Sequence, residues 1–183
     1  MGFHTFDPGR ADQLEDPTRY AYLSVDELLA LFDPAPDDVV ADLGSGTGFY
    51  TDDVAAAAGR VYAVDVQAAM HDRYRENGMP ENVVPVTADV ASLPIAEPLE
   101  AVVSTMTFHE FATAAAMDEI ASSLRPGGRV AIADWTRNGR GAAGPPLGER
   151  YGLDEAVERC TDAGIEVGRA DERRETFVLE GRV

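Results

Sequence analysis

Lysine is absent from this sequence of 183 residues, so all 15 basic side chains belong to arginine. They stand against 33 acidic residues, which gives a formal net charge of −18 at pH 7. A surface this acidic repels phosphate backbones, so a broad nucleic-acid-binding face is not expected. Such a composition is typical of halophilic proteins, whose self-repulsion is screened by a salt-loaded cytoplasm. A GC-biased genome that favours arginine, aspartate and alanine would explain it as well.

Cysteine is nearly absent too. Cys160 stands alone, which excludes an internal disulfide and a cysteine zinc cluster, and His4, His71 and His109 show no metal-ligand spacing. No apolar run is long enough to span a bilayer, and the first ten residues do not read as a signal peptide. These absences predict one cytoplasmic domain with no resident metal and no membrane span.

Three glycines mark the most informative segment, residues 38–51 (DVVADLGSGTGFYT). The mostly apolar run Val39–Leu43 predicts a strand that is buried on both faces. Gly44, Gly46 and Gly48 follow, alternating with small hydroxyl residues; they permit positive φ angles and let a ligand approach the backbone. A helical pattern then resumes. The unit is strand, glycine turn and helix, which directs the free N–H groups of the helix toward the turn.

Acidic residues mark the ends of the first three predicted strands. Asp42 precedes the glycines, Asp65 lies in the strand at residues 60–66, and Asp89 lies in that at residues 83–90. Asp65 follows the glycines by roughly 20 residues, the spacing at which a carboxylate accepts hydrogen bonds from ribose hydroxyls. The glycine spacing is G-x-G-x-G, whereas dinucleotide folds prefer G-x-G-x-x-G. An acid beside the loop suits a cationic or amino-bearing ligand better than a pyrophosphate.

The stretch VADLGSGTG resembles motif I of the class I S-adenosylmethionine (SAM)-dependent methyltransferases, and TADVASLP and LRPGGRV resemble later segments of the same class. The resemblance covers about residues 38–183 and is to the small-molecule group related to ubiquinone- and menaquinone-biosynthesis methyltransferases. It implies an α/β fold, a Rossmann-like three-layer sandwich whose seven-stranded, mostly parallel sheet ends in an antiparallel hairpin. It also implies SAM as cofactor and S-adenosylhomocysteine as product.

The resemblance assigns the cofactor contacts in order along the chain. The glycine loop and Asp42 would cradle the methionine end, Asp65 would take the ribose, and Asp89 would receive the adenine amine. Thr105 and Met106 follow the fourth strand, and residues just beyond strand ends line the ligand crevice of such folds. The full expected set is Asp42, Gly44, Ser45, Gly46, Thr47, Gly48, Asp65, Val66, Asp89, Val90, Thr105 and Met106.

Two residues after the fourth strand are candidates for catalysis. His109 aligns with a histidine of the "LHH"-like signature in the resembling group, whereas Glu110 replaces the second histidine. Methyl transfer from a sulfonium is an in-line displacement, so orientation and desolvation supply much of the acceleration. An oxygen or nitrogen acceptor can also need a base. His109 has a suitable intrinsic pKa, and Glu110 or Asp134 could serve after burial. A purely structural role for His109, orienting the loop, is the alternative.

Residues 1–37 are expected to form an arm and a helix that cover the pocket of the SAM-binding domain at residues 38–183. Ser24 can cap a helix from about Val25 to Phe32. The equivalent arm often forms part of the acceptor site in the resembling family, so His4 and the tyrosines of the arm could line a substrate pocket. The alternative is a packing arm with exposed rings.

A loop at residues 137–152 is rich in glycine, proline and arginine. Arg137, Arg140 and Arg150 could bind an acidic acceptor there, although a solvated linker is the simpler interpretation. The following helix places Cys160 on its apolar face, where it is expected to be a buried small hydrophobe rather than a nucleophile.

The leading hypothesis is a SAM-dependent methyltransferase that acts on a small-molecule acceptor. A non-catalytic protein that binds SAM or S-adenosylhomocysteine is the first alternative, and a nicotinamide-dependent oxidoreductase, disfavoured by the glycine spacing, is the second. A nucleic-acid methyltransferase is disfavoured by charge and by the lack of an Asn/Asp-Pro-Pro-aromatic tetrapeptide after the fourth strand. The acceptor and the oligomeric state, monomer or homodimer, stay open.

Overall fold

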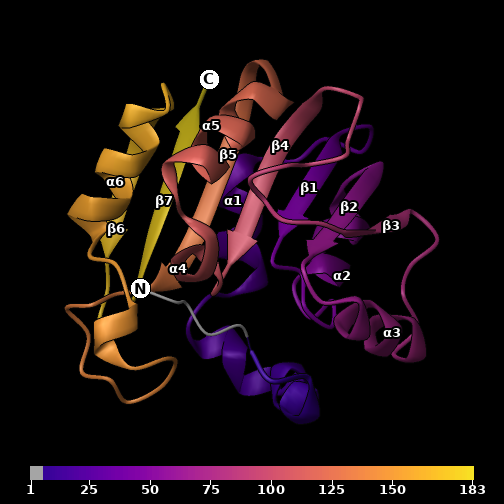
Figure 1. Cartoon of the computed structure of the whole chain (residues 1–183), viewed down its shortest axis with the longest axis horizontal. Helices are drawn as coiled ribbons and strands as arrows, with labels where there is room; N and C mark the ends of the chain where they lie inside the picture. The colour runs from indigo at the N-terminus through magenta and orange to yellow at the C-terminus, as the bar shows by residue number, and fades with distance from the viewer. Residues whose placement is uncertain (1–5) are drawn as a thin grey trace.

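The computed structural model describes residues 6–183, which form a seven-stranded sheet between two layers of helices (Figure 1). The strand order is β3-β2-β1-β4-β5-β7-β6. Neighbours pair in parallel from β3 to β5, and β7 is antiparallel to both β5 and β6. The predicted fold is thus confirmed. The strands are β1 (Val39–Leu43), β2 (Arg60–Asp65), β3 (Val83–Thr87), β4 (Leu99–Thr105), β5 (Leu124–Trp135), β6 (Glu166–Glu172) and β7 (Thr176–Arg182).

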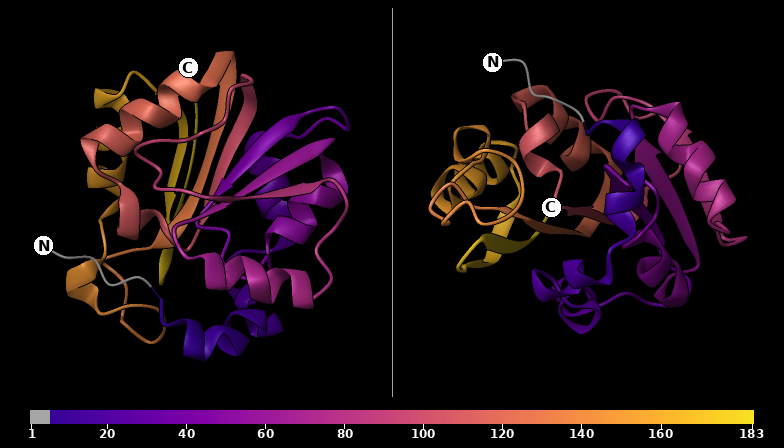
Figure 2. Two further views of the ribbon diagram at one scale, coloured as in Figure 1. Left: turned by 45° about the vertical axis from the view of Figure 1, so that its right-hand side comes forward. Right: turned by 90° about the horizontal axis from the view of Figure 1, so that it is seen from below.

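The helices divide between the two faces of the sheet (Figure 2). Buried side chains of α1, α2 and α3 share one core cluster, and those of α4, α5 and α6 share the other. None of the helices in the described part of the chain is long and apolar enough to cross a membrane. The bounds are α1 (Val25–Phe32), α2 (Thr51–Ala57), α3 (Ala68–Glu76), α4 (Phe108–Phe111), α5 (Ala114–Ser123) and α6 (Leu153–Asp162), with a short 3₁₀ helix, η3 (Leu147–Glu149).

The strand order changes direction between β1 and β4. From β1 the chain builds outward through β2 to β3, and it then returns to place β4 on the other side of β1. Ligands of open α/β sheets bind beyond the carboxyl ends of the strands at such a switch point. Thr107 holds this point together, because its Oγ1 donates to the Leu43 carbonyl at 3.0 Å and lies 3.2 Å from Ser104 Oγ.

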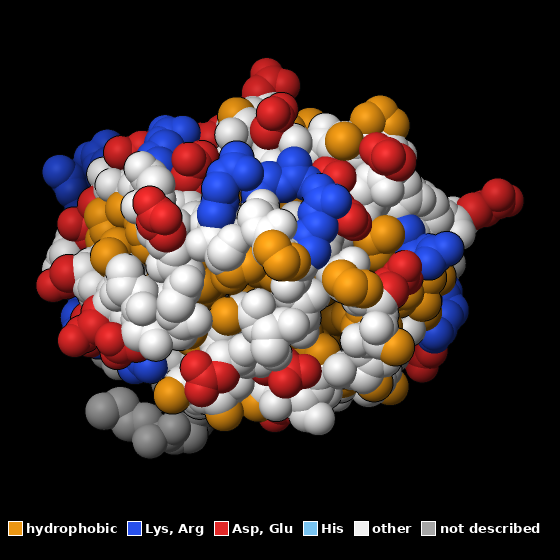
Figure 3. Space-filling view, turned by 90° about the horizontal axis from the view of Figure 1, so that it is seen from above, with side chains coloured by type: hydrophobic (Ala, Val, Ile, Leu, Met, Phe, Trp, Pro, Cys, Tyr) orange, Lys and Arg blue, Asp and Glu red, His pale blue; other side chains and the backbone are white. Residues whose placement is uncertain are grey.

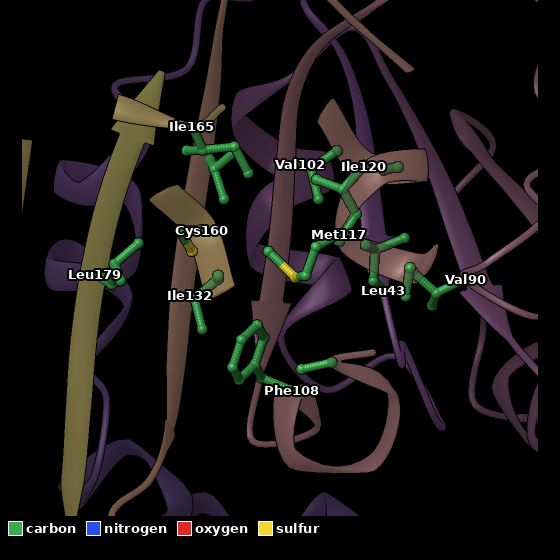
Figure 4. Close-up of a cluster of buried hydrophobic side chains, with 14 of the residues drawn as sticks. Leu43, Val90, Val102, Phe108, Met117, Ile120, Ile132, Cys160, Ile165 and Leu179 are labelled. Atoms are coloured by element: carbon green, nitrogen blue, oxygen red, sulfur yellow. The ribbon is translucent and has the colours of Figure 1, made fainter. Parts of the chain in front are cut away.

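The single cysteine belongs to one of the two hydrophobic core clusters (Figure 4). Cys160 on α6 lies among Ile132, Ile165 and Leu179 and is fully buried. Burial raises the pKa of its thiol to about 12, so the reactive thiolate is scarce at neutral pH. The prediction of a buried hydrophobe is confirmed.

The N-terminal arm forms two 3₁₀ helices, η1 (Pro8–Glu15) and η2 (Pro17–Ala21), neither of which was predicted. They lie below the carboxyl ends of the parallel strands in Figure 1 and in the left view of Figure 2. Asp7 and Asp16 cap them by accepting from the backbone N–H groups of Gly9 and Thr18. Helix α1 has the predicted bounds, and Ser24 caps it at 3.3 Å from the amide of Glu27. His4 lies outside the described residues.

At the opposite end of the molecule, acidic and arginine side chains interleave around scattered apolar ones (Figure 3). Ion pairs at the starts of the strands join Arg60 to Glu97, Arg125 to Glu100 and Arg129 to Asp38. These pairings compensate the charges of three arginines at this end.

Candidate functional site

A cavity of about 910 Å³ opens at the switch point of the sheet. The carboxyl ends of β1, β2 and β4 form its floor, and the arm and residues 143–146 form its walls. This volume lies within the range of small-molecule sites. All of the residues predicted to bind the cofactor line the cavity except Asp42 and Gly48, and both predicted catalytic residues line it too.

Asp65 fixes the glycine loop to the end of β2. Its Oδ2 accepts from the amide of Gly46 at 3.0 Å, and its Oδ1 accepts from the amide of Gln67 at 2.8 Å. Burial raises the pKa of Asp65, and the two backbone bonds oppose that shift. Each carboxylate oxygen retains a lone pair, so the carboxylate is held rigidly while it still has capacity for ligand hydroxyls.

Gly48 has a packing role rather than a contact with the cavity. Its φ angle is +94°, and an added Cβ would lie 2.0 Å from the ring of Tyr74. Gly46, at φ +54°, has open space where a Cβ would stand and only Leu14 of the arm near it, at 3.5 Å. The loop therefore needs Gly48 for packing and Gly46 for its backbone conformation.

Asp42 lies behind the glycine loop and is fully buried. Its Oδ2 accepts from Thr51 Oγ1 at 2.6 Å, whereas its Oδ1 has no hydrogen-bond partner among the described residues. Burial raises the pKa of Asp42 to about 6. The residue anchors the start of α2, and its contact with a ligand stays a prediction.

Asp89 and Val90 stand where the chain leaves β3. Val90 is buried against the core, and Asp89 is exposed at the cavity edge. Asp89 Oδ1 accepts from the amide of Ala91 at 2.8 Å, so the turn orients its carboxylate. The Asp89 carboxylate thus provides a hydrogen-bond acceptor at the cavity, and Val90 provides an apolar surface beside it.

Met106 has a strained backbone at the end of β4. Its φ angle is +62°, a left-handed value that non-glycine residues seldom adopt, and its amide donates to the Ala133 carbonyl at 2.7 Å. Thr105 precedes it, and both residues are largely buried at the cavity floor. Strained backbone of this kind concentrates at functional sites.

His109 lies on the short helix α4, next to Phe108, which anchors that helix in the core. The His109 amide donates to Asp134 Oδ2 at 2.6 Å, and its Nδ1 lies 2.9 and 3.0 Å from the two carboxylate oxygens. Because the carboxylate only accepts, Nδ1 carries the proton. The neutral imidazole then presents the lone pair of Nε2, as a general base requires.

Asp134 was considered from sequence only as a possible base. The structure makes it the partner that orients His109, since it is fully buried at the end of β5 and its Oδ1 also accepts from the amide of Trp135 at 2.8 Å. The available signal was its position: like Asp65 and Asp89, it is acidic at the end of a strand.

The charges around His109 control its protonation. Burial alone would lower the pKa of His109, but the carboxylates of Asp134 and Glu110, and the hydrogen bond to Asp134, outweigh burial and raise it. Glu110 Oε1 lies 4.0 Å from His109 Nε2. Burial raises the pKa of Glu110 to about 7, with His109 opposing the shift.

Arg19, on the arm, is a cavity-lining residue that sequence reasoning missed. Its guanidinium lies 4.8 Å from the ring centre of Phe49 and 5.1 Å from that of Tyr50, and its Nη1 donates to the Leu14 carbonyl at 2.6 Å. Burial lowers the pKa of Arg19, but an arginine keeps its charge at any physiological pH. A fixed positive charge therefore stands beside the glycine loop. No local motif signals it, because it depends on how the arm folds back.

The arm is fastened at several points across the cavity. Thr47 Oγ1 of the glycine loop donates to the carboxylate of Glu15. The Tyr20 hydroxyl donates to Asp53 at 2.9 Å. On the far side, the Gln67 side-chain amide donates to the Phe6 carbonyl at 3.0 Å.

The suggestion that arginines of the 137–152 loop bind an acidic acceptor is not supported. Arg150 is almost fully buried and donates to three carbonyls, those of Pro145, Thr136 and Ala143. Arg137 pairs with Glu155 at 2.7 Å, and neither it nor Arg140 lines the cavity. The solvated-linker interpretation is also incomplete, because residues 143–146 form a cavity wall. Through its hydrogen bonds to Ala143 and Pro145, Arg150 stabilises that wall.

The described residues contain no group of three or more histidine, cysteine, aspartate or glutamate side chains placed to hold a metal ion.

The arrangement defines a nucleotide-type site in a Rossmann-like sheet, and comparison with known proteins gives the family. Residues 40–128 match the family model described as "Methyltransferase domain". A demethylmenaquinone methyltransferase of Corynebacterium kroppenstedtii is 31% identical over 106 residues, which are 57% of this chain. This chain spans 44% of the length of that relative.

Solved structures extend the likeness to nearly the whole chain. A SAM-dependent methyltransferase of Aquifex aeolicus is 29% identical, with a TM-score of 0.87, over 98% of this chain and 100% of that one. The DhpI–SAM–HEP complex shares the fold at a TM-score of 0.76 and 21% identity, over 96% of this chain and 92% of that one. Together these likenesses support a class I SAM-dependent methyltransferase, with SAM as its cofactor.

Proposed function

We propose that this protein transfers the methyl group of SAM to a nucleophilic atom of a small-molecule acceptor. One observation carries the proposal. A single cavity is lined by most of the residues expected to bind SAM, by His109, which the buried Asp134 orients, and by the arm. A non-catalytic SAM-binding protein has no need of an oriented base, so the pair favours an enzyme.

The residues present fit SAM from one end to the other. The Asp65 carboxylate, oriented by two amides, suits the ribose hydroxyls, and Asp89 with Val90 suits the adenine. The glycine loop, Thr105 and Met106 suit the methionine part. Ser45 adds a buried hydroxyl with no hydrogen-bond partner among the described residues.

Arg19 supplies what the predicted set lacked, a cation for the methionine carboxylate. It lines the cavity together with the glycine loop, and its guanidinium makes one hydrogen bond to the described residues, which leaves donors for a ligand. Charge-assisted bonds of arginine to carboxylate are among the strongest polar contacts in proteins. Because Arg19 belongs to η2, cofactor binding would also hold the arm closed.

Bound SAM supplies an activated methyl group on a sulfonium, so the protein has to orient the acceptor, exclude water and manage one proton. In this proposal His109 Nε2 takes the acceptor proton, which is supported by the contact of Nδ1 with Asp134, since that contact holds the imidazole in the tautomer required. Asp134 also stabilises the imidazolium that results, in the way that a buried carboxylate stabilises a catalytic histidine elsewhere.

A small acceptor is favoured over a macromolecule by enclosure and charge. The arm and residues 143–146 wall the cavity. Acidic side chains outnumber arginines along the lining, which disfavours a polyphosphate substrate. The curated relative's acceptor, demethylmenaquinone, belongs to that protein, of which this chain spans 44%.

The proposal is tested by incubating the protein with methyl-tritiated SAM and separated fractions of a cell extract. Label is expected in the low-molecular-mass fraction. His109→Gln should reduce this transfer, whereas Asp118→Asn, on the exposed side of α5, should leave it unchanged. Label confined to RNA or protein would contradict a small acceptor, and SAM binding without transfer to any fraction would favour the non-catalytic alternative.

A further inference from the structure

The carboxylates that line the cavity differ in one respect. Asp7, Asp16, Asp65 and Asp89 each accept at least one backbone N–H hydrogen bond. Glu110 lines the same cavity, and no described residue donates a hydrogen bond to its carboxylate. His109 Nε2 lies 4.0 Å from its Oε1, which is beyond hydrogen-bond distance.

Glu110 is also poorly hydrated. Its side chain is 21% exposed, on α4 between the buried His109 and the half-buried Phe111. A carboxylate removed from water without a donor is unfavourable unless a ligand provides one. Burial accordingly raises the pKa of Glu110 to about 7. A positively charged donor would offset the lost hydration and restore the ionised form.

The surrounding charges favour a cation and disfavour an anion. The negative charges of Asp65 and Asp134 both raise the pKa of Glu110, whereas His109 lowers it. The arginines that line the cavity are Arg10 and Arg19, and both lie on the arm. The arginines of the 137–152 loop are held elsewhere, as described above.

The spacing of the two side chains suits one shared atom. With 4.0 Å between Glu110 Oε1 and His109 Nε2, a single nitrogen placed between them reaches both at hydrogen-bond distance. The aromatic side chains of Tyr22, Phe111 and Trp135 also line the cavity. They provide an apolar surface for the rest of such a ligand, and aromatic rings attract cations as well.

We propose, on the basis of the methyltransferase function above, that the acceptor is an amine, bound as its ammonium ion by Glu110 and deprotonated by His109. The ammonium N–H proton passes to His109 Nε2, which forms the imidazolium. The nitrogen lone pair then forms the N–CH₃ bond as the methyl–sulfur bond breaks, and its electron pair stays on sulfur as neutral S-adenosylhomocysteine. The methylated ammonium product and the imidazolium each return a proton to solvent.

Three probes of similar shape test the inference: 2-phenylethylamine, 2-phenylethanol and 3-phenylpropanoate. Each is titrated by calorimetry into the full chain saturated with S-adenosylhomocysteine, near neutral pH. The amine is expected to bind most tightly and the carboxylate most weakly. Glu110→Gln should weaken amine binding by roughly tenfold or more, because a charge-assisted bond becomes a neutral one, and leave the alcohol unchanged. Glu166→Gln, on the exposed edge strand β6, is the matched control and should change neither.

The inference is overturned if the amine fails to bind, if the alcohol or the carboxylate binds as tightly as the amine, or if Glu110→Gln leaves amine affinity unchanged. The affinity of Glu110→Gln for S-adenosylhomocysteine shows that the variant is folded. Failure of the wild-type protein to bind S-adenosylhomocysteine at all would instead overturn the proposed function, so the two failures are distinguishable.

Discussion

At the residue scale, the site depends on carboxylates in different surroundings. Asp65 is held by two amides, Asp134 by two amides and a histidine, and Asp42 by one hydroxyl. Glu110 has no donor among the described residues. We propose separate roles for these four carboxylates: ligand contact for Asp65, orientation of the base for Asp134, anchoring of α2 for Asp42 and acceptor contact for Glu110.

Asp134→Asn tests the orientation of the base. The charge of Asp134 raises the pKa of His109, so its removal should lower that pKa and move the acidic limb of the rate–pH profile to lower pH. The tautomer is no longer fixed, so the plateau rate should fall by roughly 100-fold, within the range of general-base effects. The profile is measured under saturating SAM and acceptor. A lower plateau with an unmoved limb would leave Asp134 with a purely structural role.

Asp42→Asn should stabilise the fold at neutral pH. The pKa of Asp42 rises on folding from the usual 3.8 to about 6, so its ionisation opposes folding fully above pH 6 and not at all well below pH 4. Two pKa units correspond to about 3 kcal/mol. The amide oxygen of asparagine can still accept from Thr51.

Urea unfolding of Asp42→Asn and wild type at neutral pH measures this gain. The gain should shrink as the pH falls through the window from 6 to 3.8. A gain that did not depend on pH, or a loss at neutral pH, would contradict burial of a costly charge.

At the element scale, sequence patterns located the strands and the glycine loop because those signals are local. Strand β1, the glycine loop and the position of Asp65 could be predicted because the residues that define them lie close together in the sequence. The contact between His109 and Asp134 could not be predicted in this way, because the two residues are 25 positions apart and the whole of α5 lies between them. The position of Arg19 in the cavity and the burial of Arg150 depend on how the arm and the 137–152 loop fold back. Such folding leaves no periodic pattern in the sequence.

Arg19→Gln tests the arm as part of the cofactor site. The variant should bind SAM and S-adenosylhomocysteine more weakly by roughly tenfold or more, because a bond to a charged group contributes about 1.5–3 kcal/mol. Affinity for adenosine, which has no carboxylate, should not change. Calorimetry on Arg19→Gln and on Arg182→Gln, at the exposed end of β7, makes the comparison. An equal loss for adenosine would show that the arm acts by general closure and not through the carboxylate.

At the whole-molecule scale, the dominant feature is a net charge of −18 without lysine. Ion pairs such as Arg60–Glu97 and Arg129–Asp38 offset part of the repulsion at one end, but 15 arginines cannot match 33 acids. The repulsion that remains favours expansion of the chain and is screened by salt.

The unfolding midpoint is therefore expected to rise as KCl is increased to molar concentration. Circular dichroism during thermal unfolding measures it, with the same titration repeated near the isoelectric point, where the effect of salt should be smaller. A midpoint that stayed constant or fell in KCl would remove salt adaptation as the reason for this composition and leave the genomic bias.

The most direct test of the account is a calorimetric titration of SAM, S-adenosylhomocysteine and NAD into the protein in molar KCl. We expect both sulfur ligands to bind with micromolar affinity and NAD not to bind. Asp65→Ala should abolish the binding, because the carboxylate joins the glycine loop to β2 at the expected ribose position, while Asp118→Asn should retain it. A folded protein that bound neither sulfur ligand, or bound NAD in their place, would contradict the assignment of this cavity to SAM.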